Sequence, residues 1–145
     1  MKTTKFVNKK DAQNRKTYII DAKDKILGRV AVKVAVILMG KDKPIFTPNC
    51  DCGDCVIITN AKLAKVTGNK LLEKEYFSFS GYPGGQKITT LEKMLIKKPT
   101  EAMRAAVKGM LPKSPLGRKM LKKLRVYADD KHGHQAQKPI EVGIN

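Results

Sequence analysis

The sequence predicts an α/β domain in which helices pack against a mostly parallel sheet, and two features of the chain lead to this prediction. Short apolar runs alternate with segments of helical periodicity, which is the order typical of layered α/β proteins. A length of 145 residues fits one domain, and the 41% of hydrophobic residues can supply one buried core. We therefore expect a single folded unit.

The first half of the chain predicts a strand, a helix and a second strand. Tyr18–Ile20 is a short apolar run that ends in a turn at Lys23–Lys25, and Cys55–Thr59 is rich in β-branched residues. Between them, apolar residues recur at helical spacing over Leu27–Met39, and Gly40 follows as a stop signal. This order predicts a right-handed βαβ unit.

The second half predicts shorter elements separated by glycine and proline. They are, in order, a strand Leu71–Ser80, a loop Gly81–Gly85, a helix capped by Thr90 and running through Lys97, a helix from Pro99 to about Gly109, a helix Leu116–Leu124 and a strand Val126–Ala128. The chain therefore divides into a basic N-terminal arm (1–16), one α/β domain (17–128) and a polar C-terminal tail (129–145). The order of the strands in the sheet is not predicted.

The charge of the chain predicts a polyanionic partner. Thirty Lys and Arg residues stand against thirteen Asp and Glu residues, which gives a formal net charge of +17. No apolar run approaches the ~18 residues of a membrane-spanning helix, so we expect no membrane partner. The basic N-terminus lacks the apolar stretch of a secretory signal, and we expect a cytoplasmic protein.

Basic residues are densest between Arg104 and Arg125, where no acidic residue occurs. On the predicted helix, Leu116, Met120, Leu121 and Leu124 form the buried side, and the cations project away from it. We predict phosphate contacts first at Lys113, Arg118, Lys119, Lys122, Lys123 and Arg125, and then at Arg29, Lys41, Lys43 and Lys108. The alternative is a solvated basic face without a ligand.

Aromatic residues gather beside the glycine loop. We interpret Tyr76, Phe77 and Phe79 as core side chains and expect Tyr82, inside the loop, to be exposed. The alternative is that these rings stack on bases.

The cysteines and histidines do not form a recognisable metal or catalytic motif. Cys50, Cys52 and Cys55 are three ligands where structural zinc needs four, so we predict reduced thiols, no metal and no cofactor. A fourth ligand would require His132 or His134 to fold back onto them. We interpret the two histidines as part of a tail that touches phosphate, because no nucleophile accompanies them.

Several motifs resemble the bacterial-type family of large-subunit ribosomal protein thirteen. The most specific are Val107–Pro112, Gly117-Arg118 and Leu124–Tyr127. Further matches follow the family order at Asp21-Ala22, Leu27–Arg29, Gly40-Lys41, Phe46–Pro48, Gly53-Asp54, Asn60-Ala61 and Val66–Lys70, so the resemblance covers about Lys16 to Pro139. The chain departs from the family at Asn49, Cys50, Cys52, Cys55, Ser78 and Phe79, and no RNA contact is carried over to those two loops.

The resemblance implies a three-layer α/β/α domain with a parallel four-stranded sheet. It also implies a non-enzymatic constituent of the large ribosomal subunit that binds large-subunit rRNA, joins early in assembly and lies beside other large-subunit proteins. Family members are further credited with binding mRNA and repressing translation. We expect no homo-oligomer.

Two other classes of function remain open on composition alone. An α/β sheet with glycine loops can host an enzyme acting on nucleotides, although the chain shows no catalytic set. The charge alone would also suit a DNA-architectural or non-ribosomal RNA-binding protein. The family motifs argue against both.

Overall fold

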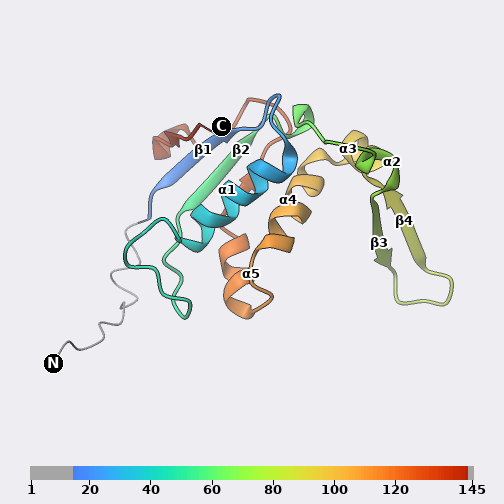
Figure 1. Cartoon of the computed structure of the whole chain (residues 1–145), viewed down its shortest axis with the longest axis horizontal. Coiled ribbons are helices and arrows are strands. Elements are labelled where there is room, and N and C mark those ends of the chain that lie inside the picture. The colour runs from blue at the N-terminus through green and yellow to red at the C-terminus, as the bar shows by residue number, and fades with distance from the viewer. Residues whose placement is uncertain (1–14, 144–145) are drawn as a thin grey trace.

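A four-stranded parallel sheet forms the centre of the domain. The structure, a computed structural model, describes residues 15–143. Strands β1 (Thr17–Asp21), β2 (Cys55–Thr59), β5 (Leu124–Val126) and β6 (Ile140–Glu141) are arranged in the order β5-β2-β1-β6, and every pairing is parallel (Figure 1). The predicted α/β class with a parallel four-stranded sheet is confirmed.

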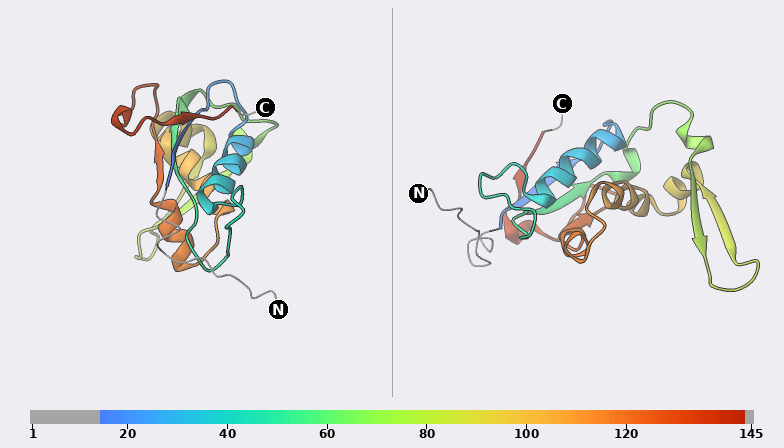
Figure 2. Two further views of the ribbon diagram at one scale, coloured as in Figure 1. Left: turned by 90° about the vertical axis from the view of Figure 1, so that its left-hand side faces the viewer. Right: turned by 60° about the horizontal axis from the view of Figure 1, so that its bottom comes forward.

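Helices cover one face of this sheet and enclose the core. They are α1 (Leu27–Met39), α4 (Pro99–Met110) and α5 (Pro115–Leu121). Val56 and Ile58 of β2 pack into one apolar cluster with Val30 and Val34 of α1 and Met103 of α4. Seen along the sheet, α1 lies on one side of the strands and the red loop between β5 and β6 lies on the other (Figure 2, left). Alternation along β2 explains this arrangement, because neighbouring residues of a strand face opposite sides.

The segment after β5 covers the second face. Ile57 is only 1% exposed, although it points away from the helices. It lines a small hollow with His134 and with Gln137 of a 3-10 turn, η3 (Gln135–Gln137). The chain then returns as β6 beside β1. The expected polar tail (129–145) therefore supplies the edge strand of the sheet, which sequence periodicity could not show because only two residues pair.

A separate hairpin projects from the domain (Figure 1). After the short 3-10 turn η2 (Ala61–Leu63), α2 (Lys70–Glu73) leads into β3 (Glu75–Phe79), which pairs antiparallel with β4 (Gln86–Thr90), and α3 (Leu91–Lys97) follows. The predicted strand over 71–80 is therefore shortened by α2. Strand β4 was not predicted because its sequence, QKITT, contains only one large apolar residue.

Helix α5 is shorter than predicted. Pro115 occupies its first turn, and the Ser114 hydroxyl accepts a hydrogen bond from the Gly117 amide at 3.2 Å. The helix ends at Leu121, and Leu124 leaves the helical path to pair with Val56 in β5. Both the helix end and the following strand consequently lie earlier than the apolar spacing predicts.

We expect Gly117→Ala to destabilise the protein by about 1–3 kcal/mol, in the range measured for overpacked sites. A Cβ at Gly117 would overlap the backbone carbonyl oxygen of Pro112, which cannot rotate away as a side chain can. Urea unfolding of the purified variant measures the loss. Gly109→Ala is the matched control, since a Cβ there meets nothing within 4 Å and alanine favours a helix. Equal stability of Gly117→Ala and the natural chain would contradict the close approach.

Candidate nucleic-acid interface

Most of the predicted phosphate-binding cations are exposed to solvent. Eight of them are exposed and form no ion pair with a carboxylate within residues 15–143. They are Lys113, Arg118, Lys119, Lys122, Arg125, Arg29, Lys41 and Lys108. Exposed cations without an ion pair can neutralise phosphate groups and release the counterions condensed on a nucleic acid. The described surface therefore suits a polyanion.

Helix α5 orients the first of these cations. Gly117 and Met120 are buried, so Arg118 and Lys119, between them in sequence, face outward. Both lie in the last turn of α5, where cations also interact favourably with the helix dipole. The predicted outward placement of Arg118 and Lys119 is confirmed.

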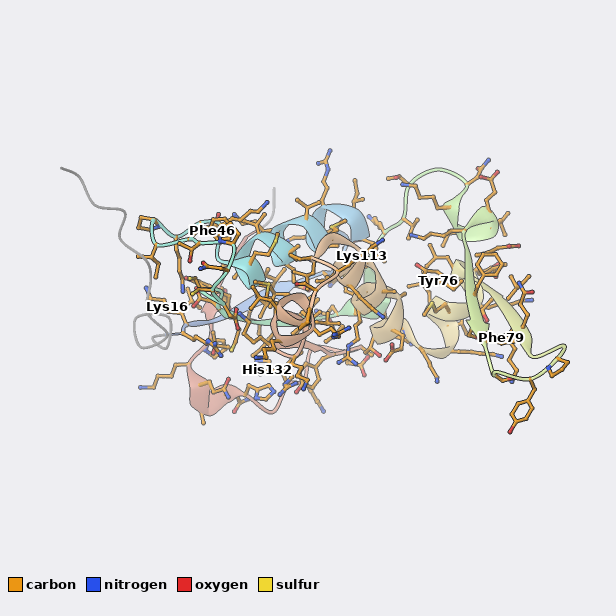
Figure 3. The ribbon with its side chains drawn as sticks, turned by 90° about the horizontal axis from the view of Figure 1, so that it is seen from below. Lys16, Phe46, Tyr76, Phe79, Lys113 and His132 are labelled. Atoms are coloured by element: carbon orange, nitrogen blue, oxygen red, sulfur yellow. The ribbon has the colours of Figure 1, made fainter. Side chains whose placement is uncertain are left out.

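Three predicted cations meet at a hollow between α4 and α5. Lys108, Lys113 and Arg118 line this hollow, whose volume is about 470 Å³, and Lys113 is labelled in Figure 3. Apolar residues such as Leu111 and Leu121 form much of the remaining wall. The site thus combines cations with apolar surface.

Further cations lie on the opposite face of the sheet. Lys122 and Arg125 line a hollow of about 230 Å³ together with His134. The Arg125 guanidinium donates a hydrogen bond to the Lys122 carbonyl oxygen at 3.3 Å. The structure therefore divides the predicted basic cluster between two faces of the domain, and Arg29 and Lys41 line neither hollow.

Lys123 does not project from the domain as predicted. Its side chain is only 7% exposed, and its ammonium group forms an ion pair with Asp51 at 2.5 Å and donates to the Leu38 carbonyl oxygen at 3.1 Å. Burial lowers the pKa of Lys123 below its ordinary value, although the neighbouring Asp51 carboxylate opposes this shift. The outward projection was predicted from a helix that in fact ends before Lys123. The ion pair indicates a structural role.

Lys43 is also engaged inside the domain. Its ammonium lies 2.7 Å from an oxygen of Asp54, which is 3% exposed, and it donates to the Cys52 carbonyl oxygen at 3.0 Å. The same Asp54 oxygen accepts a hydrogen bond from the Lys16 amide at 2.9 Å. Lys43 therefore fixes the loop between α1 and β2, and its contribution to phosphate binding stays a prediction.

The cysteines and histidines of the described residues do not come together in the geometry of a metal site. Within residues 15–143, no group of three or more His, Cys, Asp or Glu side chains is positioned to hold a metal ion. Cys52 is fully buried, and its thiol lies 3.7 Å from the Ile45 carbonyl oxygen, as expected of a small core side chain. His134 instead packs edge-on against Tyr127, with the ring centroids 6.0 Å apart.

The aromatic residues of the hairpin are not core residues, which corrects our interpretation. Phe77 and Phe79 are 65% and 69% exposed, and Tyr82 is 76% exposed, as expected for the loop. Phe77 and Ile88 are cross-strand partners. Alternation in β3 suggested a buried face, but the hairpin extends beyond the helices that would cover it (Figure 1).

Sequence reasoning missed a second group of cations. Lys65, Lys70, Lys74 and Tyr76 line a hollow of about 400 Å³ whose other wall is α4. The Lys74 ammonium lies 5.4 Å from the centre of the Tyr76 ring, and Tyr76 is labelled in Figure 3. Lys74 and Tyr76 belonged to the predicted strand 71–80, and Lys65 and Lys70 to no predicted element, so nothing in the sequence grouped them; they reach α4 only through the tertiary fold.

Comparison with known proteins identifies the family. The sequence profile described as "Ribosomal protein L13" matches residues 15–133. The large ribosomal subunit protein uL13 of Dictyoglomus thermophilum is 55% identical over 144 residues, which cover 99% of this chain and all of the relative. The proteins of the same name from Geobacter sulfurreducens and Burkholderia vietnamiensis are 53% and 56% identical with the same coverage. In residues 15–143, no helix is long and apolar enough to cross a bilayer. Because the profile and the relatives match nearly the whole chain, it belongs to the ribosomal protein L13 family.

Proposed function

We propose that this chain is a structural constituent of the large ribosomal subunit that binds and organises large-subunit rRNA in the cytoplasm. The observation that carries the proposal is the set of eight exposed cations that make no ion pair within residues 15–143. Relatives that are 53–56% identical over nearly the whole chain are named as large-subunit proteins. The same likeness argues against an enzyme.

The binding mechanism follows from the chemistry of these cations. Each Lys or Arg that neutralises a phosphate releases condensed counterions, which lowers log K by about 0.7–0.9 per log unit of salt. Such contacts do not distinguish sequences. Because cations lie on both faces of the sheet, the domain is suited to lie between RNA segments and to recognise their shape.

The proposed partner is large-subunit rRNA, and other large-subunit proteins are proposed as neighbours of the chain. The chain is proposed to join the subunit early in its assembly. Phosphate contacts also permit binding to mRNA, and repression of the chain's own message would be the consequence. Unchanged translation of that message when the protein is in excess would contradict the mRNA role and leave the ribosomal role standing.

Sedimentation tests the ribosomal proposal directly. We expect the tagged protein to travel with large ribosomal subunits through a magnesium-containing gradient after a moderate salt wash. Protein that stays at the top of the gradient would contradict the proposal. Equal affinity of the purified protein for duplex DNA and for large-subunit rRNA would instead favour a general nucleic-acid-binding protein.

A further inference from the structure

We propose that the groove crossing α4 holds a short unpaired segment of RNA, with bases on its floor and phosphates on its lysines. The groove consists of the hollow lined by Lys108, Lys113 and Arg118 and the hollow lined by Lys65, Lys70 and Lys74. This inference rests on the proposed function, because it assigns one site within the interface with rRNA.

The two hollows meet at a low ridge on α4. Both are lined by Ala105 and Gly109, which lie four residues apart and therefore on the same side of the helix. These are the two smallest residue types, and a Cβ at Gly109 would meet nothing within 4 Å. A ligand in one hollow can consequently continue over the helix into the other, across about 10 Å.

The charge of the groove selects an anionic occupant. Three cations line each hollow, and none of the lining residues described for either hollow is acidic. Lys65 is already paired with Asp24 at 2.8 Å, so five of the six cations form no ion pair within residues 15–143. The two sets come from separate parts of the chain: one from residues 65–74, in and around α2, and the other from α4 to α5. Such a double row of cations complements a chain of phosphates.

The floor of the groove distinguishes unpaired RNA from a duplex. Tyr76, Leu91 and Met110 line one hollow, and Leu111, Pro112 and Leu121 line the other. Apolar and aromatic surfaces of this kind pack against the faces of bases, which are accessible only when the bases are unpaired and unstacked. The Lys74 ammonium lies 5.4 Å from the centre of the Tyr76 ring, so a cation adjoins the aromatic part of the floor and would meet the phosphate next to a stacked base.

Filling the ridge without changing any charge tests the groove. We expect Gly109→Leu to weaken binding to large-subunit rRNA about tenfold, the effect of losing roughly one stacked base. The slope of log K against log salt should stay the same, because every cation remains. Gly133→Leu is the matched control: a Cβ at Gly133 also meets nothing within 4 Å, and Gly133 lines neither hollow.

Ultraviolet crosslinking of the unaltered protein in assembled subunits provides an independent measurement. We expect Tyr76 to crosslink to an rRNA nucleotide that is unpaired. A crosslink to a paired nucleotide or to a neighbouring protein would overturn the inference, as would Gly109→Leu binding as tightly as the natural chain. Failure of the natural chain to bind rRNA at all would instead contradict the proposed function.

Discussion

Replacing Arg118, Lys119 and Lys122 together with glutamine is expected to weaken binding to large-subunit rRNA about 100-fold near 0.1 M salt. All three are exposed, and none takes part in an ion pair within residues 15–143, so each is available to neutralise one phosphate. Three lost contacts should also lower the salt slope by roughly 2–3 units. Filter binding over a salt series measures both quantities.

The matched control removes the same charge from a different surface. Lys93, Lys97 and Lys98 are exposed residues in or directly after α3, and they line neither hollow of the α4 groove. Their replacement with glutamine should weaken binding much less. If both triple variants lose the same affinity, the protein is attracted to RNA only by its net charge. Unchanged urea unfolding of both variants would show that the fold is intact.

Lys123→Met is expected to lower the free energy of unfolding by about 3 kcal/mol, at the lower end of the effect of breaking a buried ion pair. The substitution leaves the Asp51 carboxylate, whose side chain is 16% exposed, without its 2.5 Å partner. Arg15, at 3.2 Å from Asp51, limits the loss because it still neutralises part of that charge. Urea unfolding of the isolated protein measures the change.

The adjacent lysine provides the control for this substitution. Lys122 is exposed, so Lys122→Met should change the unfolding free energy by less than about 0.5 kcal/mol. The double variant Lys123→Met with Asp51→Leu removes both charges and should recover part of the lost stability. Similar stabilities of the Lys122 and Lys123 variants would contradict a structural role for Lys123.

Local patterns predicted the central elements well. The predicted bounds of α1 and β2 agree with the structure, because helical spacing ended by Gly40 and a β-branched run are short-range features. Strands β4 and β6 were missed, since one is largely polar and the other has two residues paired with distant β1. Their existence depends on tertiary partners.

The candidate site was predicted in its residue types and only partly in its geometry. Exposure of Arg118 and Lys119 followed from the apolar face of α5. The burial of Lys123 could not be predicted, because its partner Asp51 lies 72 residues earlier in the chain. The same limitation applied to Lys65, Lys70 and Lys74, whose proximity to α4 is a property of the fold.

The position of β6 has a consequence for synthesis of the protein. Tyr18 of β1 pairs with Ile140 of β6, so one edge of β1 finds its neighbour only after more than a hundred further residues have been translated. Because domains emerge from the N-terminal side, the β1 edge stays open while the nascent chain grows. The sheet is therefore completed only after Ile140 has been synthesised, and until then the exposed edge is a site where a chaperone could protect the chain from strand-to-strand aggregation.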